Sequence, residues 1–387
     1  MWSASTPSVW GLILPLLPFY SQHFGASAFD IGALVAVFSL GQFVAAPILG
    51  RLSDRFGRKP VLLVSQAGTF ASLLILACAG NLMMVFLARV IDGLTSGNIA
   101  VASAYAVDHS SPANRRSAIG VVSAAIGTGM MCGPILAALL SHLSMSACVW
   151  AAAALVLLSI GVNITFLPAQ TKHVVDNKPE KQVTISEAIK LPGVLSVLTV
   201  LGMFYFAFAM HISQFALFLQ ERYQWDGTAF GMREIGLIFA ASGAINVFIQ
   251  AVAIKKLEKW VPEYLIACTS FTLFAAGLII VNELPGLIFL AVGLVLISVG
   301  TAVARPTLMA SLSLASSHAH QGAMMGVNTS LMAICTVIAP LGAGLLIKLN
   351  LYSGWALSIS VIMLVAAFFT QLFFRMNRWP ITRTSMP

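Results

Sequence analysis

The sequence has very few charged residues for its length. Only 9% of its 387 residues are Asp, Glu, Lys or Arg, whereas 59% are hydrophobic. An average soluble domain has roughly 25% charged residues, which cover the surface that water solvates. Because so little charge cannot cover a soluble protein of this size, soluble enzymes and nucleic-acid-binding modules are poor candidates. We therefore expect lipid to be the main solvent of the chain.

Cysteine is also scarce, and it forms no recognisable ligand pattern. The five cysteines each stand alone within an apolar run, and no C-x-x-C pair occurs. This spacing argues against both a disulfide framework and a zinc site. The H-E-x-x-H, G-x-S-x-G and P-loop patterns of common enzymes are missing as well. We therefore expect no enzyme activity, no cofactor and no metal site.

Long apolar runs are what the sequence has instead. A helix that crosses about 30 Å of hydrocarbon needs about 20 apolar residues at 1.5 Å each. Twelve segments meet this requirement, and none shows the period-two alternation of a membrane β-barrel. The predicted fold class is therefore an all-α membrane protein with twelve transmembrane helices. We place the spans near 5–22, 30–50, 60–79, 82–107, 117–140, 145–167, 193–218, 233–254, 262–281, 285–304, 321–346 and 351–374.

Lys and Arg are distributed unevenly between the predicted loops. With both termini inside, sixteen of them lie on the cytoplasmic side and three on the opposite side. Because basic loops stay in the cytoplasm, we expect both termini there. The first apolar run has no basic leader and no cleavable A-x-A pattern, so we expect it to be retained as the targeting signal. The net charge of +8 is then a topology signal with some affinity for anionic lipids, and no nucleic-acid partner is needed.

One polar stretch divides the chain into two halves. We expect a six-helix bundle over 1–168, a cytoplasmic linker over 169–191 and a second six-helix bundle over 192–387. A faint repeat supports the division, because GRLSDRFGRKP after the second span has a degenerate counterpart, IKKLEKWVPEY, after the eighth. Two pseudo-symmetric halves around a midplane cavity are typical of secondary transporters.

Four short segments stand out within this pattern. They are Gly50–Pro60 (GRLSDRFGRKP), Arg89–Gly93 (RVIDG), Gly129–Pro134 (GMMCGP) and Arg222–Thr228 (RYQWDGT). The first is similar to the motif between the second and third helices of the major facilitator superfamily. The second and third resemble the R-x-x-x-G element and the antiporter motif of its twelve-helix drug/proton antiporter branch. The fourth resembles the corresponding segment of tetracycline exporters, so the resemblance covers nearly the whole chain.

This resemblance implies a conformational latch at the first motif, formed by Gly50, Asp54, Arg55, Gly57 and Arg58. Asp54 would lie near the positive N-terminal end of the span 321–346, and Arg58 would pair with Asp108 at the inner end of the span 82–107. Such contacts exist only when the cytoplasmic side is closed, so they bias the equilibrium between inward-open and outward-open states. The alternative is a positively charged tag that only fixes the topology.

The span 82–107 carries the strongest candidate for proton coupling. Arg89, Asp92, Gly93 and Ser96 follow one another at i, i+3, i+4 and i+7, so they share one helix face. Asp92 is the only acid deep inside any of the twelve spans. Because burial raises a carboxyl pKa in general and an opposite charge lowers it, Asp92 is predicted to bind a proton and to release it when Arg89 or a cationic substrate approaches. The alternative is a permanent ion pair that only stabilises the helix.

The span 117–140 contains a stripe of small residues. Gly129 and Gly133 are four residues apart, and Pro134 removes one backbone hydrogen bond. We therefore expect a bend and a close helix contact. Ordinary membrane packing gives the same pattern, and only the resemblance connects it with antiport.

The second half supplies candidates for a substrate cavity. Polar atoms avoid lipid, so Tyr205, Gln214 and Asn246 are predicted to face the inside of the bundle. Aromatic rings with a few polar groups suit an amphipathic organic molecule. His211 is a second candidate for carrying a proton near neutral pH, after Asp92. The alternative for these residues is ordinary helix packing.

Together, the resemblance and these residues predict a secondary active transporter that exports small, mainly apolar organic compounds in exchange for protons. Its expected partners are a small-molecule substrate, protons and membrane lipids, and it is expected to be a monomer. The helix 1 and helix 3 carboxylates of tetracycline exporters align with Thr6 and Ser72, so the resemblance does not imply tetracycline. One alternative is an exporter or facilitator of a single metabolite, sugar or siderophore. An alternative of another class is a non-transporting sensor or a degenerate paralogue.

Overall fold

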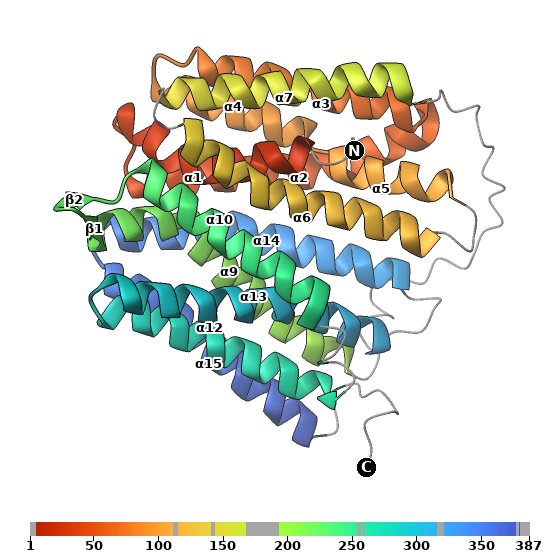
Figure 1. Cartoon of the computed structure of the whole chain (residues 1–387). Coiled ribbons are helices and arrows are strands. Elements are labelled where there is room, and N and C mark those ends of the chain that lie inside the picture. Colours follow the sequence, from red (N-terminus) through yellow and green to blue (C-terminus); the bar gives the residue numbers. More distant parts are fainter. Residues whose placement is uncertain are drawn as a thin grey trace. The chain divides into compact units, whose positions relative to one another are not determined.

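The computed structural model describes residues 5–110, 115–140, 144–167, 193–253, 257, 260–315, 321–376 and 379. Within these residues nearly all regular structure is helical (Figure 1). The exception is a hairpin in which β1 (Gln224–Trp225) pairs antiparallel with β2 (Thr228–Ala229). Asp226 and Gly227 form its two-residue turn with positive φ angles, which suits the twist of a tight hairpin.

The described helices follow the predicted spans along the whole sequence. The first half contains α1 (Ser5–His23), α2 (Ala28–Phe56), α3 (Arg58–Ala77), α4 (Leu82–Thr95), α5 (Asn98–Asp108), α6 (Arg115–Leu140) and α7 (Met145–Phe166). The second half contains α9 (Val194–Arg222), α10 (Met232–Phe248), the π-helical turn η1 (Ile249–Ala253), α12 (Glu263–Glu283), α13 (Leu287–Ala315), α14 (Gln321–Lys348) and α15 (Tyr352–Arg375).

Nine helices in the described part of the chain are long and apolar enough to cross a bilayer. They are α2, α3, α7, α9, α10, α12, α13, α14 and α15. Each of the twelve predicted spans coincides with a helix or a pair of helices. The predicted all-α membrane fold is therefore confirmed.

The predicted span 82–107 is not one continuous helix, because α4 ends at Thr95 and α5 begins at Asn98. Between them, the Ser65 hydroxyl of α3 accepts a hydrogen bond of 3.2 Å from the Gly97 N–H and donates one to the Thr95 carbonyl. A side chain thus replaces the backbone partners that an unbroken helix would supply. The apolar pattern shows no change at Ser96 and Gly97, so the sequence predicted a single helix.

The chain forms two compact units. The first contains the described residues of Met1–Asp176 and Ala216–Gly243, and the second those of Asn177–Phe215 and Ala244–Pro387. The hairpin and most of α10 thus group with the first unit. The linker predicted at 169–191 lies outside the described residues, and the domain boundaries stay a prediction.

Close backbone contact joins α2 to α4 in the first unit. A Cβ atom added at Gly93 would lie 2.5 Å from the carbonyl oxygen of Phe38, and one at Gly41 would lie 3.0 Å from the Gly93 carbonyl carbon. Only glycine permits such an approach, because any larger side chain would push the helices apart. The contact holds α4 against α2 at the residues that follow Arg89 and Asp92.

Candidate functional site

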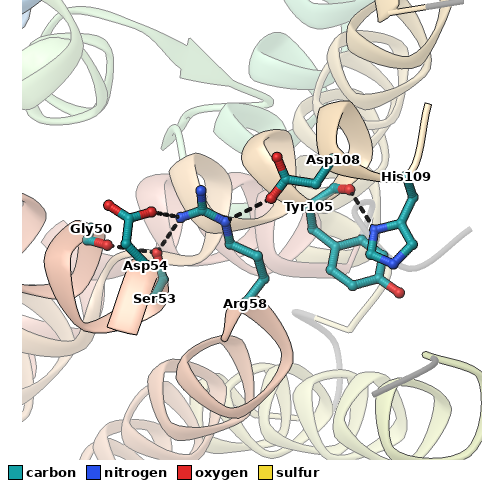
Figure 2. Close-up of polar contacts among 7 residues, drawn as sticks. All are labelled: Gly50, Ser53, Asp54, Arg58, Tyr105, Asp108 and His109. Carbon is teal, nitrogen blue, oxygen red and sulfur yellow. Dashed lines mark hydrogen bonds and ion pairs between the residues drawn. The ribbon is translucent and has the colours of Figure 1, made fainter. Parts of the chain in front are cut away.

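The turn between α2 and α3 holds a network around Arg58 (Figure 2). Its Nε lies 3.0 Å from Oδ2 of Asp108 at the end of α5, and its Nη1 lies 2.6 Å from Oδ1 of Asp54. Nη1 also donates to the Ser53 hydroxyl, which itself donates to the Gly50 carbonyl. The pair expected between Arg58 and Asp108 is therefore present, whereas its role as a latch stays a prediction.

Gly57 makes this network possible because it has a φ of +95° between the two helices. This conformation is open to glycine and rare for other residues, and it lets Arg58 begin α3 directly after the turn. Arg55 lies on the exposed side of the turn, with its guanidinium 5.3 Å from the ring centroid of Phe56. Nothing in the contacts of Asp54 tests its predicted proximity to α14.

Lys59, next to Arg58, was not singled out by the sequence. Its Nζ donates to the carbonyls of Ile164, at 2.9 Å, and Leu167, at 2.5 Å, at the C-terminal end of α7. A cation suits that end, because unpaired carbonyls and the helix dipole are negative there. The α2–α3 turn therefore holds the ends of both α5 and α7.

The second group of candidate residues lies on α4. Arg89 Nη1 is 3.1 Å from Asp92 Oδ2, and the two side chains are only 8% and 10% exposed. The Arg89 guanidinium lies 4.3 Å from the ring centroid of Phe38, which is a cation–π contact. Thr69 of α3 forms a hydrogen bond with the Asp92 side chain. The buried pair thus has an aromatic partner from α2 and a polar partner from α3.

Two features of this group are relevant to ligand binding. The Arg89 Nε atom is buried and has no hydrogen-bond partner among the described residues. Ser96, predicted on the same face, follows the end of α4 and accepts a 3.0 Å hydrogen bond from Gln42 Nε2 of α2. Neither Gln42 nor Ser65 was recognised from the sequence, because both act on α4 from other helices.

The positions aligned with the tetracycline-exporter carboxylates contribute little to this group. Ser72 is buried on α3, and its hydroxyl donates to the Thr69 carbonyl of its own helix. The side chain of Thr6 lies outside the described residues. Within the described part of the first unit, Asp92 is thus the buried carboxylate.

The small-residue motif of α6 has a partner that the sequence did not indicate. A Cβ added at Gly236 of α10 would lie 3.1 Å from Ala138 Cβ and 3.2 Å from the Pro134 carbonyl oxygen. Gly133 and Pro134 are buried, as is Gly129 one turn earlier. The motif therefore faces a close approach by α10, within the first unit.

His211 lies on α9 in the second unit and is surrounded by aromatic rings. Its ring centroid is 4.4 Å from that of Phe215, 5.2 Å from that of Phe274 and 6.2 Å from that of Trp355. Its side chain is buried, and Nδ1 has no hydrogen-bond partner among the described residues. The second proton candidate therefore has an aromatic environment, whereas Asp92 has a polar one.

Each of the three predicted cavity residues has its own surroundings in the structure. Tyr205 and Gln214 are nine residues apart on α9, so they point to opposite faces of that helix. The Tyr205 hydroxyl donates a 2.9 Å hydrogen bond to Asn328 Oδ1 of α14. Asn246 Nδ2 lies 3.5 Å from Thr301 Oγ1 of α13. Gln214 is fully buried.

Comparison with known proteins gives consistent matches over most of the chain. The family model described as the Major Facilitator Superfamily matches residues 3–340. The tetracycline resistance protein of class D from Salmonella ordonez is 32% identical over 351 residues, which cover 86% of this chain and 84% of that protein. Multidrug resistance protein 1 from Bacillus subtilis (strain 168) is 24% identical over 341 residues, which cover 88% and 86%.

The solved structure of the nucleoside transporter NupG matches with a TM-score of 0.82 at 13% identity, covering 96% of this chain and 98% of that chain. At this identity the likeness concerns the fold alone. It agrees with the predicted twelve-helix architecture.

Proposed function

Because the chain belongs to the major facilitator superfamily, we propose that it is a proton-coupled exporter of small, mainly apolar organic compounds. It is a multi-pass membrane transporter related to tetracycline and multidrug exporters. In our proposal it works by alternating access in a bacterial inner membrane with both termini in the cytoplasm. The sixteen-to-three distribution of Lys and Arg supports this orientation. Inward proton flow supplies about 2.3 kcal/mol per charge for each 100 mV of membrane potential, in addition to the pH difference.

The observation that carries the proposal is the buried pair of Arg89 and Asp92. When Asp92 is ionised, the two charges cancel and the guanidinium is held at its carboxylate. When Asp92 takes up a proton, that attraction is lost and the site gains a positive charge, which favours release of a cationic substrate. Substrate and proton therefore compete for one carboxylate, which is the requirement for exchange.

The contacts of Arg89 support this cycle. After Asp92 is protonated, the ring of Phe38 still stabilises the guanidinium, and the Nε–H has no competing partner among the described residues. Arg89 is then available to a different acceptor without leaving α4. In this proposal Asp92 receives its proton from outside and loses it to the cytoplasm, and His211 is a second and weaker proton site.

The network around Arg58 supplies the conformational part of the proposal. Its link to Asp108 joins α3 to α5, and Lys59 joins the same turn to α7. These contacts hold the helix ends together on the side that the predicted topology assigns to the cytoplasm. We propose that they stabilise the state in which that side is closed, and that the glycines of α6 permit the accompanying helix movement.

Transport into inside-out vesicles tests the function directly. With an acidified lumen, the wild-type protein is expected to accumulate ethidium, and a protonophore is expected to abolish the accumulation. Asp92→Asn is expected to reduce the pH-driven rate at least about tenfold, since it removes the titrating group, and to keep exchange of ethidium down its own gradient. Asp226→Asn, in the exposed hairpin turn, is the matched control and is expected to behave as wild type.

Other results would replace the proposal. Wild-type rates in Asp92→Asn under a pH gradient would remove Asp92 as the proton site. Ethidium movement that ignores the protonophore would indicate a facilitator. If a broad panel of drugs and metabolites produced no flux at all, a non-transporting membrane protein would be the better description.

A further inference from the structure

Arg305 has no ion-pair partner among the described residues. It lies on α13, one of the helices long and apolar enough to span the bilayer, and it is exposed. Arg89, which lies on the apolar helix α4, is buried and paired with Asp92. Because a charge in a membrane segment costs several kcal/mol unless it is paired or used, the contrast calls for a ligand at Arg305.

The neighbours of Arg305 are hydrogen-bonding groups from two other helices. Tyr205 of α9 forms a hydrogen bond with Arg305 and donates one to Asn328 Oδ1 of α14. Tyr205 and Asn328 are 3% and 7% exposed, so they are fixed inside the second unit. Met309, one turn after Arg305, places its sulfur 3.8 Å from the same hydroxyl. Side chains of α13 and α14 thus meet at the phenol oxygen of Tyr205 on α9.

These groups offer more donors than acceptors. A guanidinium has five N–H donors and no acceptor, and the phenol oxygen satisfies only one of them. The hydroxyl proton is used by Asn328 Oδ1, so the Asn328 amide nitrogen adds two further donors nearby. A planar anionic group such as a carboxylate accepts two parallel hydrogen bonds from a guanidinium. The apolar Met309 side chain is suited to the hydrophobic part of such a molecule.

We propose that Arg305, Tyr205 and Asn328 form a binding site for the anionic group of an amphipathic organic molecule, a carboxylate, sulfonate or phosphate. The site rests on the proposed export function, to which it adds organic anions as a class of cargo. Arg305 binds the anion, and Tyr205 and Asn328 position the guanidinium.

The place of the site along the helices suits loading from the cytoplasm. Arg305 is ten residues before the end of α13, Tyr205 eleven after the start of α9 and Asn328 seven after the start of α14. At 1.5 Å per residue these are about 10 to 17 Å from the helix ends that the predicted topology places in the cytoplasm. Thr301 lies one helical turn before Arg305 on α13, and its Oγ1 is 3.5 Å from Asn246 Nδ2 of α10. These two residues continue the polar face away from the cytoplasmic side.

A lipid phosphate offers the same chemistry as an anionic cargo. We assign the site to cargo because two of its three side chains are more than nine-tenths buried, whereas a headgroup would contact exposed side chains. The two sources are separated by comparing liposomes of phosphatidylcholine alone with liposomes that also contain phosphatidylglycerol.

The test uses the full-length protein and one rhodamine dye in two forms, the free carboxylate and its methyl ester. Arg305→Gln is expected to raise the apparent KM for the carboxylate about tenfold or more and to leave the KM for the ester within about twofold. Arg305→Lys is expected to recover part of the loss, because it keeps the charge without the planar fork. Tyr205→Phe is expected to raise the carboxylate KM about threefold. Arg375→Gln, which removes a charge at the end of α15, is the matched control and is expected to change neither KM.

Dye binding to the purified protein, measured by fluorescence anisotropy, separates the two proposals. If the wild type transports neither dye but binds the carboxylate through Arg305, the export function is wrong and the anion site stands. If Arg305→Gln weakens the binding of both dyes equally, or weakens the binding of neither, the anion site is overturned. If phosphatidylglycerol abolishes the Arg305-dependent binding, the ligand is a lipid and the assignment to cargo is overturned; binding that persists supports it.

Discussion

The hydroxyl of Ser65 in α3 accepts a 3.2 Å hydrogen bond from the backbone N–H of Gly97, between the end of α4 and the start of α5. The same hydroxyl donates to the Thr95 carbonyl, so one side chain holds both edges of the interruption. The pair of Arg89 and Asp92 lies on α4, and Asp108 lies at the end of α5. Ser65 therefore stabilises the joint between the proposed proton site and the proposed latch.

Replacing Ser65 with alanine is expected to loosen this joint. The substitution leaves the Gly97 N–H without its partner, which costs about 1–3 kcal/mol for a buried group. We expect a lower melting temperature of the purified protein and a smaller pH-driven transport rate. Hydrogen–deuterium exchange is expected to rise most at residues 95–98.

Ser72→Ala provides the control on the same helix. Its hydroxyl is buried, and among the described residues its one hydrogen bond is to the Thr69 carbonyl of α3 itself. It is expected to change stability and transport less than Ser65→Ala. Equal effects of the two substitutions on exchange at residues 95–98 would contradict a special role for Ser65.

Gly93→Ala is expected to separate α2 from α4. The added methyl group would lie 2.5 Å from the Phe38 carbonyl oxygen, so the backbone must shift, at a cost of about 1–3 kcal/mol. The shift also displaces the Phe38 ring from Arg89. Gly161→Ala on α7 is the control, because a Cβ there meets nothing within 4 Å, and alanine favours the helix by up to about 1 kcal/mol. Thermal unfolding in detergent measures the stability of both variants. Equal stability of Gly93→Ala and Gly161→Ala would disprove the close contact.

The sequence predicted those parts of the molecule that depend on local patterns. Apolar length located the spans, since hydropathy and helix rise need no tertiary information. The spacing of Arg89 and Asp92 placed both side chains on one face, where they do form an ion pair. The pair of Arg58 and Asp108 came from a motif resemblance, because the two residues are 50 positions apart.

Features made by distant side chains could not be predicted. The interruption at Ser96 and Gly97 depends on Ser65, about thirty residues earlier, and a single glycine within an apolar run does not identify it. The site at Arg305 depends on three helices, with Tyr205 and Asn328 separated by 123 residues. In both cases the residue types are common, and only the packing of helices gives them partners.

Breaking the link between Arg58 and Asp108 is expected to favour opening of the cytoplasmic side. The two side chains are 19% and 35% exposed, so we expect a coupling of about 0.5–1 kcal/mol, or a two- to fivefold change in a two-state equilibrium.

Arg58→Gln and Asp108→Asn are compared singly and together in a double-mutant cycle. Faster hydrogen exchange at the start of α3 and the end of α5, together with slower ethidium transport, is the expected result. The effects are expected to shrink at 1 M salt, since exposed charges are screened there. Unchanged exchange and transport in both single variants would exclude a latch.

His211→Phe tests whether a second group takes part in proton coupling. The ring of His211 packs among Phe215, Phe274 and Trp355, so phenylalanine is expected to preserve the packing and the melting temperature within a few degrees. The aromatic faces would attract a protonated imidazole, but Nδ1 has no acceptor among the described residues, whereas Asp92 has both Arg89 and Thr69 as partners. We therefore expect His211→Phe to weaken the pH dependence of ethidium transport less than Asp92→Asn does. A larger loss in His211→Phe than in Asp92→Asn would reverse this order and place the main proton site in the second unit.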